Sequence, residues 1–105
     1  MSASLVYVTT TSPDEAARIG GMLVTERLAA SVNILGEVRS IYRWENEIHD
    51  KKETLLIVKT STLCVSELID RIRSLHSYQC PCIVAWRLDG GSDAYLNWIG
   101  RETTQ

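Results

Sequence analysis

The sequence lacks the features that mark membrane, secreted and nucleic-acid-binding proteins. No segment approaches the roughly 20 consecutive apolar residues that a membrane-spanning helix requires, so no membrane partner is expected. The net charge of −2 gives no general electrostatic attraction to nucleic acid. The chain begins with neither a basic segment nor the apolar core of a signal peptide, so we expect a cytoplasmic protein.

Cysteine is scarce, and the common catalytic motifs are absent. The three cysteines are Cys64, Cys80 and Cys82, and an odd number argues against a disulfide framework. A bridge between Cys80 and Cys82 would close a very short, strained loop, so all three thiols are expected to be reduced. The chain has no Walker loop and no GxGxxG, HExxH or GxSxG motif. We therefore assign no catalytic residue and expect a protein that is not an enzyme.

Length and composition indicate one soluble domain. We predict that residues 1–105 form a single domain with one core, because 105 residues leave little surplus for a separate lobe. The apolar fraction of 45% and the charged fraction of 23% are those of an ordinary globular protein. Neither repeats nor low-complexity segments divide the chain.

A long β-hairpin dominates the middle of the sequence. Two β-rich runs, residues 31–44 and 47–60, meet at Glu45-Asn46, and Asn tolerates the left-handed backbone of a tight reversal. Apolar alternation breaks around Gly36, which predicts a β-bulge there. Strands are typically about 5–6 residues long, so the far end of this hairpin must project beyond the helices. Projecting strand edges pair with other chains, and this predicts self-association.

A strand and a helix precede the hairpin. Residues 5–10 are β-rich, and Ser12-Pro13-Asp14-Glu15 predicts a helix start with Ser12 as its cap and Glu15 completing a capping box. Apolar residues recur at helical spacing: Ala16, Ile19, Leu23, Val24 and Leu28. We interpret Gly20-Gly21 as a site where the helix packs closely on a sheet.

A second helix, a strand and a terminal helix follow the hairpin. The helix covers residues 62–75, with a buried stripe predicted at Val65, Leu68, Ile69, Ile72 and Leu75. Residues 81–88 form the fourth strand, and a last helix begins at Ser92. The order is βαββαβ plus a C-terminal helix. It predicts an α+β fold of the ferredoxin-like type, a four-stranded antiparallel sheet with both main helices on one face.

Five segments resemble the CutA family, which is named for divalent-cation tolerance. They are LVTERLAASVNI at 23–34, SIYRWENEI at 40–48, ETLLIVKT at 53–60, HSYQCP at 76–81 and DAYLNWI at 93–99. The resemblance implies a ferredoxin-like subunit in a homotrimer, with hairpins that wrap neighbouring subunits. It also implies a link to copper and other divalent metals, no established reaction, and a trimer like that of PII-type signalling proteins.

The chain departs from the family pattern at positions that concern metal binding. Thr10 stands where some members have a cysteine proposed as a copper ligand, and Leu75-His76 replaces the paired histidines proposed with it. Only His76 remains of that ligand set, so the resemblance does not carry over a whole copper site. The usual HPYExPE segment reads HSYQCPC here, which removes two carboxylates and adds two thiols.

A candidate metal site comes from these thiols. His76, Cys80 and Cys82 lie within seven residues, and soft thiolates favour Cu(I) or Zn over hard cations. The alternative is that both cysteines are small buried side chains at the start of a strand. We predict His76, Cys80 and Cys82 as possible Cu or Zn ligands, with no cofactor required.

A candidate ligand site combines aromatic side chains with a cation. Tyr42, Trp44, Lys59 and Tyr78 are predicted to line a cleft between subunits, where aromatic walls and a Lys charge would suit a small anion. The alternative is that the aromatic residues stabilise the trimer interface.

Charged residues near the hairpin tip are interpreted as a solvated surface. Acidic and basic side chains are mixed there: Glu45, Glu47, His49, Asp50, Lys51, Lys52 and Glu53. Because both signs are interspersed, the carboxylates are not predicted to form a cation site.

The sequence supports two functional hypotheses. The first is a homotrimeric CutA-like protein that acts in divalent-cation (copper) tolerance by binding metal ions, without enzymatic turnover. The second is a PII-like trimeric sensor or scaffold that binds a small anion at subunit clefts and signals to a protein partner.

Overall fold

A computed structural model describes residues 2–103, which pack around one four-stranded antiparallel sheet. The strands are β1 (Ala3–Thr10), β2 (Ser31–Trp44), β3 (Glu47–Ser61) and β4 (Ile83–Arg87), and their order across the sheet is β2-β3-β1-β4. The helices are α1 (Pro13–Thr25), α2 (Val65–Leu75) and α3 (Asp93–Glu102), and a short 3-10 turn, η1 (Thr62–Cys64), leads into α2. This architecture confirms the predicted ferredoxin-like α+β fold. Residues 1, 104 and 105 of the predicted domain lie outside the described part.

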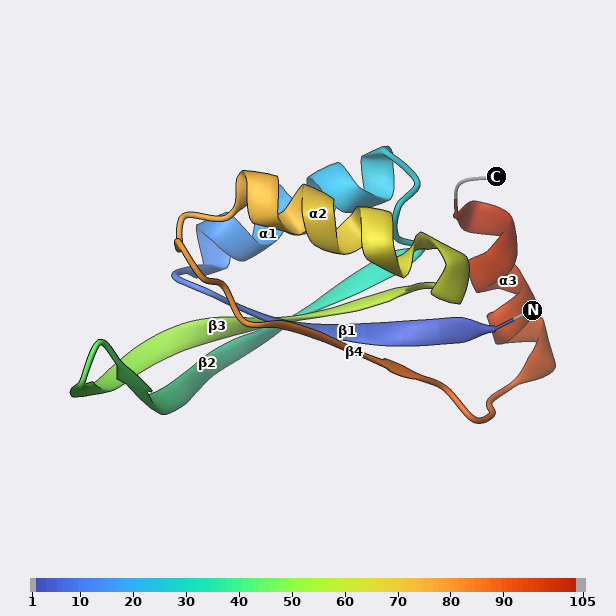
Figure 1. Cartoon of the computed structure of the whole chain (residues 1–105). Coiled ribbons are helices and arrows are strands. Elements are labelled where there is room, and N and C mark those ends of the chain that lie inside the picture. The colour runs from blue at the N-terminus through green and yellow to red at the C-terminus, as the bar shows by residue number, and fades with distance from the viewer. Residues whose placement is uncertain (1, 104–105) are drawn as a thin grey trace.

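Two helices cover one face of the sheet, and the third lies at its end. Figure 1 shows α1 and α2 side by side above the strands, with α3 next to the N-terminal end of β1. The core between helices and sheet is formed by alternate strand residues and one stripe of each helix. Its buried members are Val6, Val8, Ile19, Leu23, Leu28, Ala29, Leu56, Val58, Leu68 and Ile72. Among residues 2–103, no helix has the length and apolarity needed to cross a bilayer.

The start of α1 forms as predicted in one respect and differs in another. Ser12 caps the helix, because its hydroxyl accepts the backbone N–H of Glu15 at 3.1 Å. The carboxylate of Glu15 does not return to Ser12 as a capping box requires. It accepts instead the backbone N–H of Thr11 at 2.9 Å, together with the Thr11 hydroxyl at 3.0 Å.

The structure shortens both predicted main helices. α1 ends at Thr25, because Arg27 adopts a left-handed backbone with φ of 61°, and Leu28 is buried just beyond the helix. Residues 62–64 form η1 rather than the first turn of the predicted helix 62–75. β4 begins at Ile83, two residues later than predicted, since the preceding Pro81 has no N–H to donate to a ladder.

The two glycines of α1 have different surroundings. A Cβ added to Gly20 would lie 2.9 Å from Cγ2 of Val32 on β2, so the predicted close packing of helix on sheet is confirmed there. A Cβ added to Gly21 would meet open space. The interpretation was therefore wrong for Gly21.

The hairpin extends well beyond the body of the protein. β1 pairs with β3 only from Thr54 to Ser61, so residues 37–53, which we call the arm, have no third strand beside them. The arm accounts for the elongated dimensions of 44 × 25 × 23 Å and is the part of Figure 1 that reaches past the helices. The register shifts between Leu35 and Glu37, which confirms the bulge predicted at Gly36. At the tip, Glu45 and Asn46 both have positive φ, of 50° and 66°.

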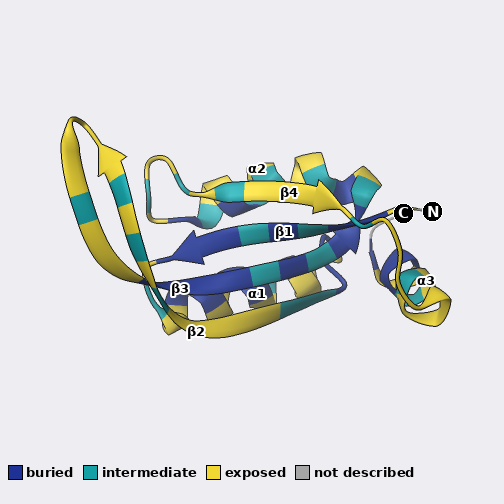
Figure 2. Cartoon of the chain, turned by 90° about the horizontal axis from the view of Figure 1, so that it is seen from below, coloured by how far each residue is buried: buried dark blue, intermediate teal, exposed yellow. Residues whose placement is uncertain are grey.

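Within residues 2–103, no layer covers the face of the sheet opposite the helices. Val6 and Val8 of β1 point into the core, so Leu5 and Tyr7 point to the opposite side. Directly paired residues share a face, which places further side chains beside them. We call this surface the open face: Leu5, Tyr7, Leu35, Ile57, Val84 and Trp86. Figure 2 looks onto it and shows β4 and β2 largely exposed, with the helices behind.

Candidate functional site

A groove lies on the helix-free side of the sheet, where the arm leaves the body. Its volume is about 720 Å³, within the range of small-molecule sites. The C-terminal end of β1 supplies Tyr7 and Thr9, and the arm supplies Tyr42, Trp44, His49, Lys51 and Glu53 among others. The loop between α2 and β4 supplies Tyr78, Gln79, Cys80, Pro81 and Cys82. The groove thus brings together segments that are distant in the sequence.

A buried carboxylate forms part of this groove. Glu53 is only 5% exposed, and its Oε2 accepts the hydroxyl hydrogen of Tyr78 at 2.7 Å. Partial burial and the neighbouring Glu53 carboxylate raise the pKa of Tyr78, so its hydroxyl stays protonated and continues to donate. Glu53 was interpreted as one of the solvated charges near the tip, and that was wrong. It pairs with Val38 at the base of the arm, where the sheet body shields it.

Two thiols line the same groove. Cys80 and Cys82 are exposed and in no disulfide, whereas Cys64 is buried and does not line the groove. The alternative that Cys80 and Cys82 are small buried side chains at a strand start is therefore wrong: both are exposed, and β4 begins only at Ile83. Partial desolvation, followed by the negative charge of Glu53, raises the pKa of Cys82. Near neutral pH this cysteine is a thiol rather than a thiolate.

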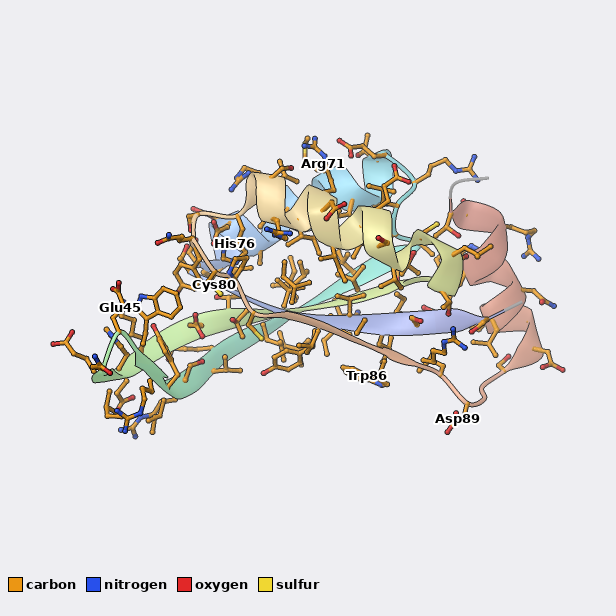
Figure 3. All side chains as sticks on the ribbon, in the orientation of Figure 1. Glu45, Arg71, His76, Cys80, Trp86 and Asp89 are labelled. Atoms are coloured by element: carbon orange, nitrogen blue, oxygen red, sulfur yellow. The ribbon has the colours of Figure 1, made fainter. Side chains whose placement is uncertain are left out.

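His76 has a structural role at the end of α2. Its Nδ1 accepts the backbone N–H of Tyr78 at 3.0 Å, so Nε2 carries the proton and donates to the carbonyl oxygen of Thr9 at 2.8 Å. Both ring nitrogens are thus engaged, and neither is left for a metal or for activating a thiol. Figure 3 labels His76 and Cys80 in this part of the chain. Within residues 2–103, no three His, Cys, Asp or Glu side chains gather as a metal site, so the predicted His76–Cys80–Cys82 set does not assemble in the protomer.

The structure groups three of the four predicted ligand-site residues. Tyr42, Trp44 and Tyr78 line the groove, but Lys59 does not. Lys59 pairs with Ser31 near the other end of β3, and its Nζ lies 5.6 Å from the ring centroid of Tyr95. The cation that lines the groove is Lys51, together with Arg39. Arg39 already binds both carboxylate oxygens of Asp50, at 2.8 and 2.6 Å.

His49 is a groove residue that the sequence interpretation placed on the solvated tip. Its ring stacks on Tyr42, with centroids 5.2 Å apart and planes 13° from parallel. Its Nε2 is buried and has no hydrogen-bond partner among residues 2–103. The register could have revealed this pair, because counting outward from the two-residue turn at Glu45-Asn46 places Tyr42 opposite His49.

These features define a class of protein: a ferredoxin-like α+β protomer with a projecting β-arm and a groove at the base of that arm. Sequence comparison then gives the family. The family described as "CutA1 divalent ion tolerance protein" matches residues 4–102, so the chain belongs to the CutA family.

Curated relatives support the same assignment. The chain is 44% identical over 100 residues to the divalent-cation tolerance protein CutA of Thermus thermophilus, covering 95% of this chain and 96% of that protein. It is 35% identical over 99 residues to the chloroplastic CutA protein of Arabidopsis thaliana, covering 94% of this chain but 54% of that protein. The chain therefore spans nearly all of the bacterial relative and about half of the plant one.

Solved structures of the family share the fold closely. The CutA1 protein of Thermus thermophilus superposes with a TM-score of 0.94 at 41% identity, covering 97% of this chain and 99% of that one. The CutA1 protein of Oryza sativa has a TM-score of 0.96 at 32% identity, covering 100% of this chain and 96% of that one. The ferredoxin-like architecture is thus common to this chain and its relatives.

Proposed function

We propose that the chain forms a cytoplasmic homotrimer that acts in divalent-cation tolerance, with copper as the main ion, and that it does so by binding metal rather than by catalysis. The tolerance role is supported by the names of its relatives, including a divalent-cation tolerance protein that is 44% identical. The assembly is supported by the shape and surface of the protomer itself.

The open face is the main support for self-association into the proposed trimer. Leu35, Val84 and Trp86 are 43%, 54% and 45% exposed, although each is a large apolar side chain on one side of a sheet. Grouped apolar exposure of this kind marks an interaction surface. In Figure 3, Trp86 points away from the helices, toward the uncovered side. The unpaired edges of the arm adjoin this face, so a neighbouring subunit can cover the face and pair with an edge in one assembly.

Metal binding is proposed at Cys80 and Cys82, with copper or zinc as the ion. Both thiols are exposed and line the groove. Soft ligands of this type select copper and zinc over Mg²⁺ or Ca²⁺. His76 is not part of the proposed site, because Thr9 and Tyr78 hold its two ring nitrogens.

Sedimentation velocity tests the assembly. The wild-type chain is expected to sediment as a particle of three times 11.8 kDa. Val84→Glu places a charge on the open face and is expected to give a folded monomer. Leu63→Glu is the matched control, because Leu63 is 93% exposed in η1, away from that face. A wild-type chain that stays monomeric while folded excludes the proposed trimer.

Growth of a copper-sensitive bacterial strain tests the tolerance role. Expression of the wild-type chain is expected to raise the copper concentration that the strain survives, and expression of Val84→Glu is not. Equal survival with the wild-type chain and with an empty vector would contradict the proposed role.

A second candidate function is supported by the chemistry of the groove. Tyr42, Trp44 and Tyr78 provide aromatic walls, and Lys51 provides a positive charge, as a small planar anion would require. The protein would then act as a PII-like sensor that reports this ligand to a protein partner. Thermal melts against a panel of nucleotides and carboxylates test it, because ligand binding to the native state raises Tm. Lys51→Gln should abolish the shift, whereas Lys52→Gln, which changes a lysine outside the groove lining, should not.

A further inference from the structure

The loop between α2 and β4 presents two thiols with few other metal ligands near them. Cys80 and Cys82 flank Pro81, and both are exposed in the groove. Two residues of extended chain span at most about 7 Å, and alternate side chains of such a segment share one face, so both thiols can be directed toward one ion. Pro81 fixes its own φ and restricts Cys80, which holds this spacing.

The other candidate ligands around the pair are already engaged or out of reach. His76 uses both ring nitrogens, at 2.8 Å from the Thr9 oxygen and 3.0 Å from the Tyr78 nitrogen. Glu53 accepts the Tyr78 hydroxyl at 2.7 Å, and a carboxylate is in any case a hard ligand. His49 lines the same groove and its Nε2 has no hydrogen-bond partner among residues 2–103, but its ring stacks on Tyr42, and the described residues contain no group of three potential metal ligands.

The number of ligands decides which ion fits. Zn²⁺ is almost always held by four ligands in structural sites and by three protein ligands in catalytic ones. Cu(II) prefers a square-planar or tetragonal set of nitrogen and oxygen ligands. A pair of thiolates with no third ligand instead suits a soft monovalent d¹⁰ ion, because such ions accept two sulfurs in a linear arrangement.

From this arrangement we propose that Cys80 and Cys82 form a two-coordinate Cu(I) site, which deepens the metal-binding role proposed above and rests on it. Cu(I) enters already reduced, each thiol loses one proton to solvent, and two Cu–S bonds form with no change in oxidation state. Both thiols line the groove, so a thiolate of another molecule that enters the groove can reach the ion and exchange it. Of the ions considered above, the site therefore favours Cu(I) over Zn²⁺ and Cu(II).

Anaerobic titration of the full chain with Cu(I), in competition with the chromophoric chelator bicinchoninate, tests the proposal. The wild-type chain is expected to bind one Cu(I) per protomer. Cys80→Ser and Cys82→Ser should each weaken binding by about 100-fold or more, since even changes outside the ligand shell cost about 10–100-fold. Cys64→Ser is the matched control, because it removes a thiol that lies away from the groove, and it should bind as the wild type does. Unchanged binding in either groove variant overturns the site.

Two measurements on the wild-type chain make the test independent of variant folding. X-ray absorption at the copper edge should show two sulfur neighbours and no nitrogen or oxygen, and a third ligand overturns the two-coordinate site. Cu(I) should protect Cys80 and Cys82 together from iodoacetamide, as mapped by mass spectrometry. Binding of Zn(II) or Cu(II) without binding of Cu(I) would refute the two-coordinate Cu(I) site but not the proposed metal-binding role. If none of the three ions binds, both the Cu(I) site and the metal-binding role are refuted.

Discussion

Glu15 at the start of α1 accepts the backbone N–H of Ser77 at 2.9 Å and so ties the start of α1 to the loop that follows α2. The same carboxylate accepts two hydrogen bonds from Thr11 and lies 3.7 Å from the guanidinium of Arg18. Ser77 begins the loop that carries the groove residues Tyr78, Cys80 and Cys82. A single buried carboxylate therefore anchors the loop on which the proposed metal site depends.

Lowering the pH is expected to remove the stabilisation that Glu15 provides. Burial acts to raise its pKa, but the hydrogen bonds from Thr11 and Ser77 outweigh burial and lower the pKa from 4.5 to about 2. Because the folded-state pKa lies below the unfolded-state value, the stabilisation is complete above the unfolded-state pKa. It is lost as the pH falls through the folded-state value, and a shift of this size corresponds to about 3 kcal/mol at most.

Urea unfolding at fixed protein concentration measures this effect. Glu15→Gln should lower the free energy of unfolding by about 2–3 kcal/mol near neutral pH, and the difference from wild type should shrink toward pH 2. Asp14→Asn, at an exposed carboxylate in the same helical turn, is the control and should change little. A difference that is the same at neutral and acidic pH would show that Glu15 does not act through its charge.

Removing the Tyr78 hydroxyl should destabilise the fold through Glu53. Tyr78→Phe leaves a carboxylate that is 5% exposed without its 2.7 Å donor, which costs about 1–3 kcal/mol or more for a charged group. Glu53→Gln combined with Tyr78→Phe should recover part of the loss, because the buried charge is then gone. Tyr95→Phe, whose hydroxyl lies 3.5 Å from Ser31, serves as the control in the same thermal and urea melts. A Tyr78→Phe protein as stable as the wild type would contradict the importance of this bond.

The two glycines of α1 should respond in opposite directions to alanine. Gly21→Ala enters open space and should stabilise the protein by about 0.5–1 kcal/mol through helix propensity. Gly20→Ala places Cβ 2.9 Å from Val32, and overpacking of about 1–3 kcal/mol should exceed the gain in propensity. Chemical denaturation of both variants measures the contrast, and Val32→Ala should rescue Gly20→Ala. If Gly20→Ala stabilises the protein, Val32 on β2 must shift at little cost in free energy to make room for the added Cβ.

Trp44→Ala should weaken the proposed trimer before it unfolds the protomer. Trp44 lies in the arm, is 41% exposed in the protomer, and offers a large apolar surface to a neighbouring subunit. Truncating a tryptophan anchor at an interface typically costs about 2 kcal/mol or more. Size-exclusion chromatography across a dilution series should show earlier dissociation than in the wild type or in Lys52→Ala. A Trp44→Ala trimer that persists at nanomolar concentration would contradict the prediction.

Local patterns in the sequence predict the elements of this fold well. The apolar spacing of Ala16, Ile19 and Leu23 places the buried stripe of α1, and the break at Gly36 places the bulge, because both depend on near neighbours along the chain. The errors fall at boundaries. The left-handed Arg27 ends α1 before Leu28, and Pro81 delays β4 to Ile83.

The candidate site was predicted only in part. Tyr42, Trp44, Tyr78, Cys80 and Cys82 do meet in one groove. His76 and Lys59 do not serve as predicted, since their side chains meet partners from elsewhere in the fold: Thr9 for His76 and Tyr95 for Lys59. Sequence spacing cannot give such pairings, because the sheet order β2-β3-β1-β4 brings together residues that are far apart in the chain.

The sequence by itself determined the order of strands and helices, the length of the hairpin and the family, because periodicity, turn residues and motif order are properties of the chain alone. Only the tertiary structure decided which polar groups are satisfied and which remain available. Burial of Glu53 beneath Tyr78, capture of both nitrogens of His76 and exposure of the two groove thiols all follow from the packing of distant segments. The physical reason is that hydrogen-bond partners and solvent access depend on the final positions of atoms, and these are fixed only when the sheet and helices pack together.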